Sequence, residues 1–390
     1  MSAGDYVIEV RDSPLDIDRH DWNTLLAAQG DDATPFMRHE YLAAMHESGS
    51  ATPETGWTPR FPTLWWQPRH GPRELLGACA LYLKNHSYGE YVFDHAWAHA
   101  YRQHGVPYYP KALVPGARLL ARDAPARLAL AQALVAWSEQ SGLSSLHLLF
   151  TSDADVQACR DAGLMLRHNV QFHWTNRPDT YRDFDDLLAS LNQDKRKKIR
   201  QERRKVAQAG VVFRWSRGSD IAAPDWDFFY RCYERTYYEH GNAPYLTRDF
   251  FHRMARDMPE NWLLFVAERG GKPIAASLIA LSGGAGGVPG IAYGRYWGAL
   301  ERVDCLHFDA CYYEPLQWCI AHGMRRFEGG AQGEHKMARA LLPVQTTSAH
   351  WLAHPAFADA VDDFLQRERA GIRNYLGELA RHNPFKAGQA

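Results

Sequence analysis

The sequence predicts an α/β protein of the α+β kind, in which mixed, mainly antiparallel sheets are flanked by helices. Three observations support this prediction. Short runs rich in β-branched and aromatic residues alternate with stretches whose apolar residues recur every three or four positions. The order strand, two helices, hairpin, strand, helix, strand occurs twice along the chain. The 390 residues exceed one ordinary core, so two domains are expected.

The first copy of this order fills the N-terminal half. YVIEV predicts a strand, and the spacing of Trp22, Leu25 and Leu26 predicts a helix. A second helix is expected between Pro35 and Gly49, because proline favours a helix start and glycine a helix end. Two β-prone runs around the turn-forming HGPRE predict a hairpin. Helix, strand, helix and strand then follow at 124–141, 145–150, 153–163 and 165–176.

The second copy repeats the pattern. One helix is expected from Phe184 through a basic stretch to Gln208, and RGGK predicts the turn of a hairpin at 262–281. The other expected elements are a strand at 211–215, helices at 224–240 and 247–258, a strand at 291–300, a helix at 306–323 and a strand at 325–330. An amphipathic helix at 357–379 is expected to be a packing or partner surface. The predicted domains are therefore 1–178 and 179–390.

Composition limits the classes of protein. Lys and Arg number 44 against 45 Asp and Glu, so no global attraction to polyanions is expected. The six cysteines form no CxxC pair, which favours buried thiols in a reducing compartment over disulfides or a metal site. No signal peptide and no run of about 20 apolar residues is found. The sequence thus predicts a cytoplasmic protein without a membrane span.

The richest titratable chemistry lies between 325 and 351. Glu328, His335 and Lys336 surround a turn that contains three glycines and Gln332. Glycine lets a ligand approach backbone N–H groups closely, while the acid, imidazole and ammonium groups exchange protons or hold an anion. Glu328 and His335 are both candidate general bases, and a structural hydrogen-bond role remains open for each.

Two neighbouring strands carry further candidates. If 291–300 pairs with the strand that ends at Glu328, Tyr293 becomes a candidate general acid for the leaving group, and Arg295 and Tyr296 flank the substrate. In the first half, alternate residues form a polar strand face that indicates a wet substrate cleft: Lys84, His86, Tyr88 and Glu90.

A basic run from Lys195 to Lys205 places eight cationic side chains in eleven positions. A solvated helix face is the simpler explanation. Because the rest of the chain is nearly neutral, Lys197, Lys198 and Arg200 are also candidates for binding a phosphate-bearing substrate or tRNA.

The repeated order of elements resembles two Gcn5-related N-acetyltransferase (GNAT, acyl-CoA N-acyltransferase) domains in tandem. The segments HEYLAAMHESGS, LYLKNHSYGEYVFDHAW, LNQDKRKKIRQERRKV, YGRYWG, LHFDACYYEP and FEGGAQGEHKMARALLPV are similar to the FemAB-like, predicted N-acyltransferase family. The resemblance covers about residues 35–365.

This resemblance implies transfer of an acyl or aminoacyl group to an amine. The donor is expected to be acyl-CoA, such as acetyl-CoA, or aminoacyl-tRNA, and the acceptor a small-molecule or cell-wall-precursor amine. Lys336 matches a lysine near the reacting centre of FemX-like proteins, which implies oxyanion or phosphate binding. Gly116 and Arg118 stand where the fold usually holds the donor's pyrophosphate in the first domain.

The leading hypothesis is an N-acyltransferase in which a bound amine attacks the donor directly, since no GxSxG or HExxH motif supports a covalent or metal mechanism. One alternative is an aminoacyl-tRNA-dependent transferase, favoured by the basic run. Another is a binding module that kept the fold without the chemistry. Oligomeric state and acyl length have no signal in the sequence.

Overall fold

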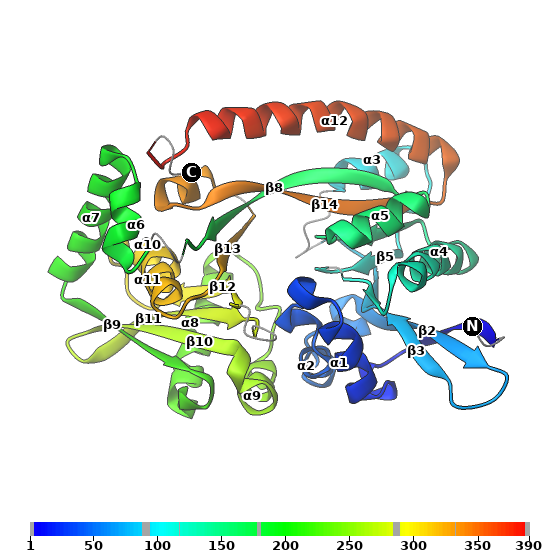
Figure 1. Cartoon of the computed structure of the whole chain (residues 1–390), viewed down its shortest axis with the longest axis horizontal. Helices are drawn as coiled ribbons and strands as arrows, with labels where there is room; N and C mark the ends of the chain where they lie inside the picture. Colours follow the sequence, from blue (N-terminus) through cyan, green and yellow to red (C-terminus); the bar gives the residue numbers. More distant parts are fainter. Residues whose placement is uncertain are drawn as a thin grey trace. The chain divides into compact units, whose positions relative to one another are not determined.

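The computed structural model describes residues 4–87, 94–116, 118–177, 181–283, 289–331 and 333–386. These residues form two compact units. Unit 1 comprises 1–169 with 346–373, and unit 2 comprises 170–345 with 374–390. Each unit contains a sheet flanked by helices, which confirms the predicted fold class (Figure 1). Within the described ranges, no helix combines the length and apolarity that crossing a membrane requires.

Unit 1 is built on a sheet with the strand order β6-β3-β2-β4-β5-β7-β14, and β1 pairs with β2. Its pairings are antiparallel except for that of β5 with β7. The strands are β1 (Gly4–Arg11), β2 (Trp57–Pro68), β3 (Glu74–Ala78), β4 (Leu81–Lys84), β5 (Lys111–Val114), β6 (Leu120–Ala121), β7 (Ser145–Leu148), the start of β8 (Met165–Thr175) and the end of β14 (Leu342–Leu352). The helices are α1 (Arg19–Ala27), α2 (His39–Glu47), α3 (His95–Gln103), α4 (Ala124–Gln140), α5 (Asp153–Asp161) and the first part of α12 (Pro355–Arg381).

Unit 2 has the strand order β8-β13-β12-β11-β10-β9; its described pairings are antiparallel, apart from the parallel pairing of β12 with β13. The strands are β9 (Val211–Arg217), β10 (Trp262–Arg269), β11 (Lys272–Leu281), β12 (Ile291–Ala299) and β13 (Arg326–Ala331), with the end of β8. The helices are α6 (Phe184–Ser190), α7 (Gln193–Gln208), α8 (Ala223–Glu239), α9 (Arg248–Asp257), α10 (Leu306–Phe308), the π-helical turn Asp309–Tyr313, α11 (Glu314–Ala321) and the 3₁₀ turn η9 (Glu334–Arg339).

Local sequence explains how helices cover both faces of the unit 2 sheet. A Cβ on Gly298 would lie 1.9 Å from the carbonyl oxygen of Cys232, so α8 packs directly onto β12 only because this position lacks a side chain. On the opposite face, the hydroxyl of Ser277 donates a 2.6 Å hydrogen bond to the carbonyl of Ala310 in the π-helical turn. The neighbouring strands β11 and β12 are therefore held between α8 and the α10–α11 segment.

Three expectations differ from the structure. The helix expected at 184–208 is two helices, because Leu191 is extended and pairs with Phe385. The second arm of the first hairpin divides into β3 and β4, which pair with different parts of β2. The helix expected at 306–323 is interrupted by the π-helical turn.

The compact units also divide the chain differently from a boundary at residue 178. Residues 346–373, expected in the second domain, belong to unit 1. The physical reason lies within unit 1, where Ala349–Leu352 pair with β7 and Leu352, Val361 and Leu365 pack against Trp97 and Tyr101.

Candidate active site

Three side chains in unit 2 lie in one row across adjacent strands. Tyr293 on β12 is in register with Glu328 on β13, which is in register with His173 on β8. Residues in register point to the same face of a sheet, so the phenol, carboxylate and imidazole share one face. His173 Nε2 lies 4.0 Å from the Glu328 carboxylate. This row unites two predicted residues, Tyr293 and Glu328, with His173.

Charge and burial define this row. Arg326, two residues before Glu328, makes a 2.6 Å ion pair with its carboxylate. Burial lowers the pKa of His173, and the charges of Arg326 and Lys336 lower it further, while Glu328 opposes them. His173 is therefore neutral at neutral pH, and its Nε2 lies 3.0 Å from the side-chain oxygen of Gln171. The row offers one carboxylate beside a neutral imidazole.

The row lies where two strands part. The described parallel register joins Ile291–Tyr293 to Arg326–Glu328, although β12 continues to Ala299 and β13 to Ala331. Beyond Glu328 the pairing of β13 with β8 also shifts before Ala331. An irregular strand edge of this kind presents backbone groups to a ligand at the end of the row.

The glycine turn after Glu328 is required by close packing and by backbone conformation. A Cβ on Gly329 would lie 2.3 Å from Leu341 Cδ2 and 3.0 Å from the carbonyl oxygen of Phe172. Gly333 has φ +93°, and a Cβ there would lie 2.3 Å from the His335 ring. The glycines thus let the chain fold tightly back into η9, which carries His335 and Lys336.

Lys336 is held inside this turn. Its ammonium donates hydrogen bonds of 2.7 Å to the carbonyl of Gly329 and 3.3 Å to that of Gly330. Burial lowers the pKa of Lys336 to about 8. Its Cδ lies 3.7 Å from the Cβ position of Gly329, and side chains alternate along a strand, so Lys336 approaches β13 from the face opposite to Glu328.

His335 is exposed and points to aromatic neighbours. Its Nε2 lies 3.5 Å from the hydroxyl of Tyr312, and its ring centroid lies 5.9 Å from that of Phe308. Partial burial lowers its pKa, and Arg339 and Lys336 add to the effect. The structure therefore places His335 with the α10–α11 segment rather than with Glu328.

The remaining predicted residues of β12 lie in different surroundings. Arg295 is exposed, with its guanidinium carbon 5.3 Å from the Tyr296 ring centroid. Tyr296 packs edge to face against Tyr233 and Phe251 of α8 and α9. Gln332 lies outside the described residues.

The predicted cleft of unit 1 is partly described. Lys84 is fully buried, with its Nζ 3.6 Å from the centroid of the Trp57 ring and 3.3 Å from His86 Nδ1. Burial lowers the pKa of His86. Tyr88 and Glu90 lie outside the described residues. At the described end of this strand, Lys84 is therefore buried whereas His86 stays partly exposed.

The predicted anion junction of unit 1 makes protein contacts. Arg118 donates hydrogen bonds of 2.9 Å to the carbonyl of Asp32 and 2.5 Å to that of Phe150. Gly116 has φ +57° with open space around its Cα. Arg118 thus ties three segments of unit 1 together.

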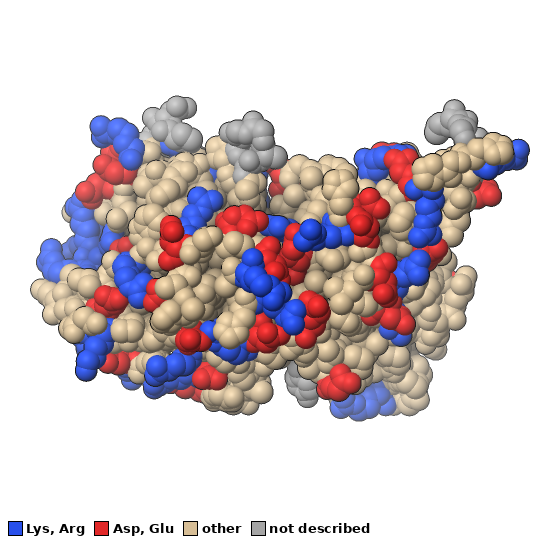
Figure 2. All heavy atoms as spheres, turned by 90° about the horizontal axis from the view of Figure 1, so that it is seen from below, with Lys and Arg blue, Asp and Glu red and all other residues tan. Residues whose placement is uncertain are grey.

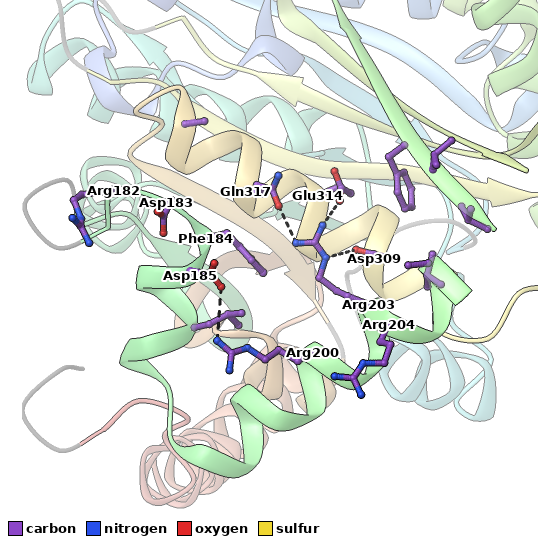
Figure 3. A pocket seen from close by; sticks show the side chains of 17 residues that line it. Arg182, Asp183, Phe184, Asp185, Arg200, Arg203, Arg204, Asp309, Glu314 and Gln317 are labelled. Atoms are coloured by element: carbon purple, nitrogen blue, oxygen red, sulfur yellow. Dashed lines mark hydrogen bonds and ion pairs between the residues drawn. The ribbon is translucent and has the colours of Figure 1, made fainter. Parts of the chain in front are cut away.

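A pocket of about 940 Å³ adjoins the basic helix α7 (Figure 3). Its charged lining alternates between arginines and acids: Arg182, Arg200, Arg203 and Arg204 with Asp183, Asp185, Asp309 and Glu314. Of the predicted phosphate-binding residues, Arg200 lines the pocket, whereas Lys197 and Lys198 are exposed on the helix outside it. Figure 2 shows basic and acidic side chains interspersed on the face drawn, so any phosphate site there depends on local groups.

Arg203 forms the floor of this pocket. It donates a 2.8 Å hydrogen bond to Gln317, forms an ion pair with Glu314 and approaches Asp309 Oδ1 to 3.2 Å. Burial raises the pKa of Asp309 to about 7 although Arg203 opposes it. At the exposed rim, Arg200 lies 3.8 Å from Asp185, and Arg204 follows one helical turn later. An anion at the rim would therefore meet Arg204 and would compete with Asp185 for Arg200.

Sequence reasoning missed two groups of polar residues. His173 could have been found from the alternation of Gln171 and His173 with buried Phe172 and Trp174 on β8. A hydrogen-bonded polar chain in unit 1, buried except at its Ser348 end, carried no comparable pattern: Ser348, His350, His147, Tyr108, Asp94 and Lys111. Among the described residues, His, Cys, Asp and Glu side chains form no group able to hold a metal ion.

Comparisons with known proteins place this geometry in context. The family described as FemAB-like, peptidoglycan biosynthesis/recognition, matches residues 13–387. A search of curated proteins gives no match. The solved structure of FemX aligns with a TM-score of 0.54 at 11% identity, covering 91% of this chain and 100% of that chain. A tandem GNAT protein from the clavulanic acid biosynthesis pathway aligns with 0.49 at 14% identity, covering 90% and 99%. L-PGS from Bacillus licheniformis aligns with 0.49 at 10% identity, covering 87% and 98%. At these identities the FemX likeness shows a shared fold.

Proposed function

The chain belongs to the FemAB-like family and is a transferase of acyl or aminoacyl groups, and from that premise we propose that unit 2 transfers an acyl group from acyl-CoA to an amine. The observation that carries this proposal is the row of Tyr293, Glu328 and His173 at the point where β12 and β13 part. The family description favours an amine on a cell-wall precursor as the acceptor.

The reaction needs a proton acceptor and a proton donor. The lone pair of the acceptor amine attacks the acyl carbon, and the Glu328 carboxylate takes the proton that the nitrogen releases. The tetrahedral intermediate then collapses with loss of the CoA thiolate, which takes a proton from the hydroxyl of Tyr293. Arg326 orients the Glu328 carboxylate through its 2.6 Å ion pair. Neutral His173 supplies a hydrogen-bonding neighbour without a competing positive charge.

Lys336 would act from the other face of β13. Its ammonium fixes the carbonyl oxygens of Gly329 and Gly330, so the turn that follows Glu328 has one geometry. Its positive charge is also felt at the row, where it lowers the pKa of His173, and it would favour a developing oxyanion there. With a pKa of about 8, Lys336 stays mainly protonated at neutral pH. His335 remains an alternative base for an acceptor that enters from the α10–α11 side.

The donor's phosphates would be held at the pocket beside α7. Arg200 and Arg204 stand one helical turn apart on its rim, and guanidinium groups bind phosphate oxygens with paired donors. The apolar lining of Val206, Val211 and Phe213 suits an uncharged part of the same ligand.

Substitution of Glu328 tests the catalytic proposal. Glu328→Gln keeps the shape of the side chain and removes the proton acceptor, so kcat with an amine acceptor should fall about 10²- to 10⁴-fold with little change in KM. Glu334→Gln is the matched control, because Glu334 is an exposed acid of the neighbouring turn that contacts Tyr375. Retention of kcat within a few-fold in Glu328→Gln would remove Glu328 from the mechanism.

A second candidate is an aminoacyl-tRNA-dependent transferase, and the basic face of α7 favours it. Thermal unfolding with acetyl-CoA, longer acyl-CoAs or charged tRNA distinguishes the donors, because a ligand of the native state raises the midpoint. A rise with acyl-CoA that is lost in Arg200→Glu/Arg204→Glu supports the first candidate. A rise with tRNA that disappears between 50 and 200 mM salt supports the second. Lys205→Glu on the same helix is the control, since Lys205 does not line the pocket.

A further inference from the structure

The turn that carries His335 and Lys336 is held by a buried ion pair. Arg339 on η9 has a side chain that is 1% exposed, and its guanidinium donates hydrogen bonds of 2.9 and 3.0 Å to the Glu202 carboxylate on α7. The same guanidinium donates a 2.7 Å bond to the carbonyl of His335. One arginine therefore connects the backbone of the turn to α7.

Two aromatic residues complete this connection. The Arg339 guanidinium carbon lies 3.5 Å from the centroid of the Phe308 ring, and the hydroxyl of Tyr313 donates a hydrogen bond to Glu202. Phe308 directly precedes the π-helical turn and Tyr313 is its last residue. A π-helical turn is a departure from α-helix that often marks functional sites. Glu202 is thus the carboxylate at which α7, the α10–α11 segment and η9 meet.

The backbone of the turn depends on this anchor. It begins at Gly333 with φ +93° and ends at Ala340 with φ +68°, and an alanine adopts positive φ only where its surroundings enforce it. Ala340 directly follows Arg339, and the next residue, Leu341, donates from its backbone N–H to the carbonyl of Lys336. Loss of the contact between Glu202 and Arg339 would let Ala340 relax from its positive φ. Lys336 would then no longer be held in its present position.

We propose that Glu202 is a positioning residue, which acts through Arg339 to hold Lys336 against the carbonyls of Gly329 and Gly330. This inference deepens the proposed function and rests on it for its catalytic consequence. The structural part of the proposal concerns only the position of Lys336, and that position can be tested without a substrate.

The test compares the chemical reactivity of Lys336 in folded variants. Glu202→Gln leaves the buried guanidinium without its charge partner and risks misfolding, so the double variant Glu202→Leu/Arg339→Met removes both charges together. Lys336 of the native protein and of each variant is acylated with acetic anhydride across pH 6–11, and its modification is followed by peptide mass spectrometry. Glu314→Gln is the matched control, because it breaks the neighbouring ion pair between α7 and α11 through Arg203.

We expect Lys336 of the native protein to titrate near pH 8, and Lys336 of the double variant to titrate near the value of a solvated lysine. The reactive fraction at pH 8 should then fall about a hundredfold in the double variant and stay unchanged in Glu314→Gln. An unchanged titration in a folded double variant would overturn the proposal. Activity retained by Lys336→Met, with the titration still dependent on Glu202, would instead refute only the catalytic role of Lys336.

Discussion

His147 and His350 face each other in the interior of unit 1. They are in register across β7 and β14, and their Nδ1 atoms lie 2.8 Å apart, a spacing at which the two nitrogens share one proton. Because Tyr108 donates to Asp94, its oxygen accepts from His147 Nε2, so His147 Nδ1 is the acceptor and His350 Nδ1 carries the proton. Neutral imidazoles alone are compatible with this order.

This arrangement predicts acid sensitivity. Burial lowers the pKa of both histidines well below its usual value, and Lys111 and Arg167 lower it further, whereas Asp94 opposes this for His350. The unfolded chain takes up protons near pH 6.5 and the folded one does not. The free energy of unfolding therefore has its full value, as far as these two histidines are concerned, above about pH 6.5. Below that pH it falls by up to about 1.4 kcal/mol per pH unit for each histidine.

Urea unfolding between pH 4.5 and 7.5 measures this effect. His350→Gln should reduce the slope of the unfolding free energy against pH below pH 6.5 by up to about 1.4 kcal/mol per pH unit, because one imidazole with a lowered pKa is removed. Exposed His20→Gln is the control and should leave the slope unchanged. An equal slope in the native protein and His350→Gln would contradict the prediction.

Some residues of the candidate active site could be predicted from the sequence, and others could not. Glu328 and Tyr293 were proposed because glycines and strand patterning surround them, and the register places the two next to each other. The pairing of Glu328 with His173 was not accessible, because it arises from the contact of β13 with a strand far away in the sequence. The separation of Lys336 from Glu328 onto opposite faces of β13 likewise follows from the tight glycine turn, which periodicity does not describe.

At the scale of elements, apolar periodicity predicted the strands and the long helices, but it did not predict where helices are interrupted. The break between α6 and α7 depends on Leu191 pairing with Phe385, a residue near the chain end. The π-helical turn depends on packing against β11, where Ser277 binds the carbonyl of Ala310. Local sequence predicts an element, and distant contacts decide where it is interrupted.

The glycine turn makes a prediction about an element. Gly329→Ala places a Cβ within 2.3 Å of Leu341 Cδ2 and 3.0 Å of the Phe172 carbonyl, so β13, β8 and η9 must move apart. We expect a loss of about 1–3 kcal/mol in unfolding free energy and a large loss of activity, because Glu328 and Lys336 flank this position.

Gly371→Ala in α12 is the matched control for that substitution. A Cβ at Gly371 meets no heavy atom within 4 Å, and alanine favours helix, so the variant should gain about 0.5–1 kcal/mol. The two free energies are measured by denaturant unfolding at one pH. Equal stability of Gly329→Ala and the native protein would show that the strands tolerate the side chain.

At the scale of the whole molecule, the repeat of elements was predictable and the path of the chain was not. Both units contain antiparallel strands followed by a helix and a parallel strand, as the repeated order indicates. Residues 346–373 nevertheless complete unit 1, because Ala349–Leu352 pair with β7 there. Pairing between segments this distant depends on which apolar residues become buried together. Because apolar residues of similar pattern occur in both halves, the sequence does not indicate which segments pair.

This path predicts how fragments of the chain behave. A fragment of residues 1–178 lacks the strand that pairs with β7 and the side chains of Leu352, Val361 and Leu365, which pack against Trp97, Tyr101 and Tyr108. It also leaves His147 without His350 in a fully buried position, where an unpaired polar group is costly. We expect this fragment to show no cooperative unfolding transition and to bind a hydrophobic dye.

Residues 1–169 joined through a flexible Gly/Ser linker to 346–373 should unfold cooperatively, because all partners of the unit 1 core are then present. Both fragments are compared by near-ultraviolet circular dichroism and thermal unfolding, and cooperative unfolding of 1–178 with an equal midpoint would show that the first 178 residues form a domain on their own.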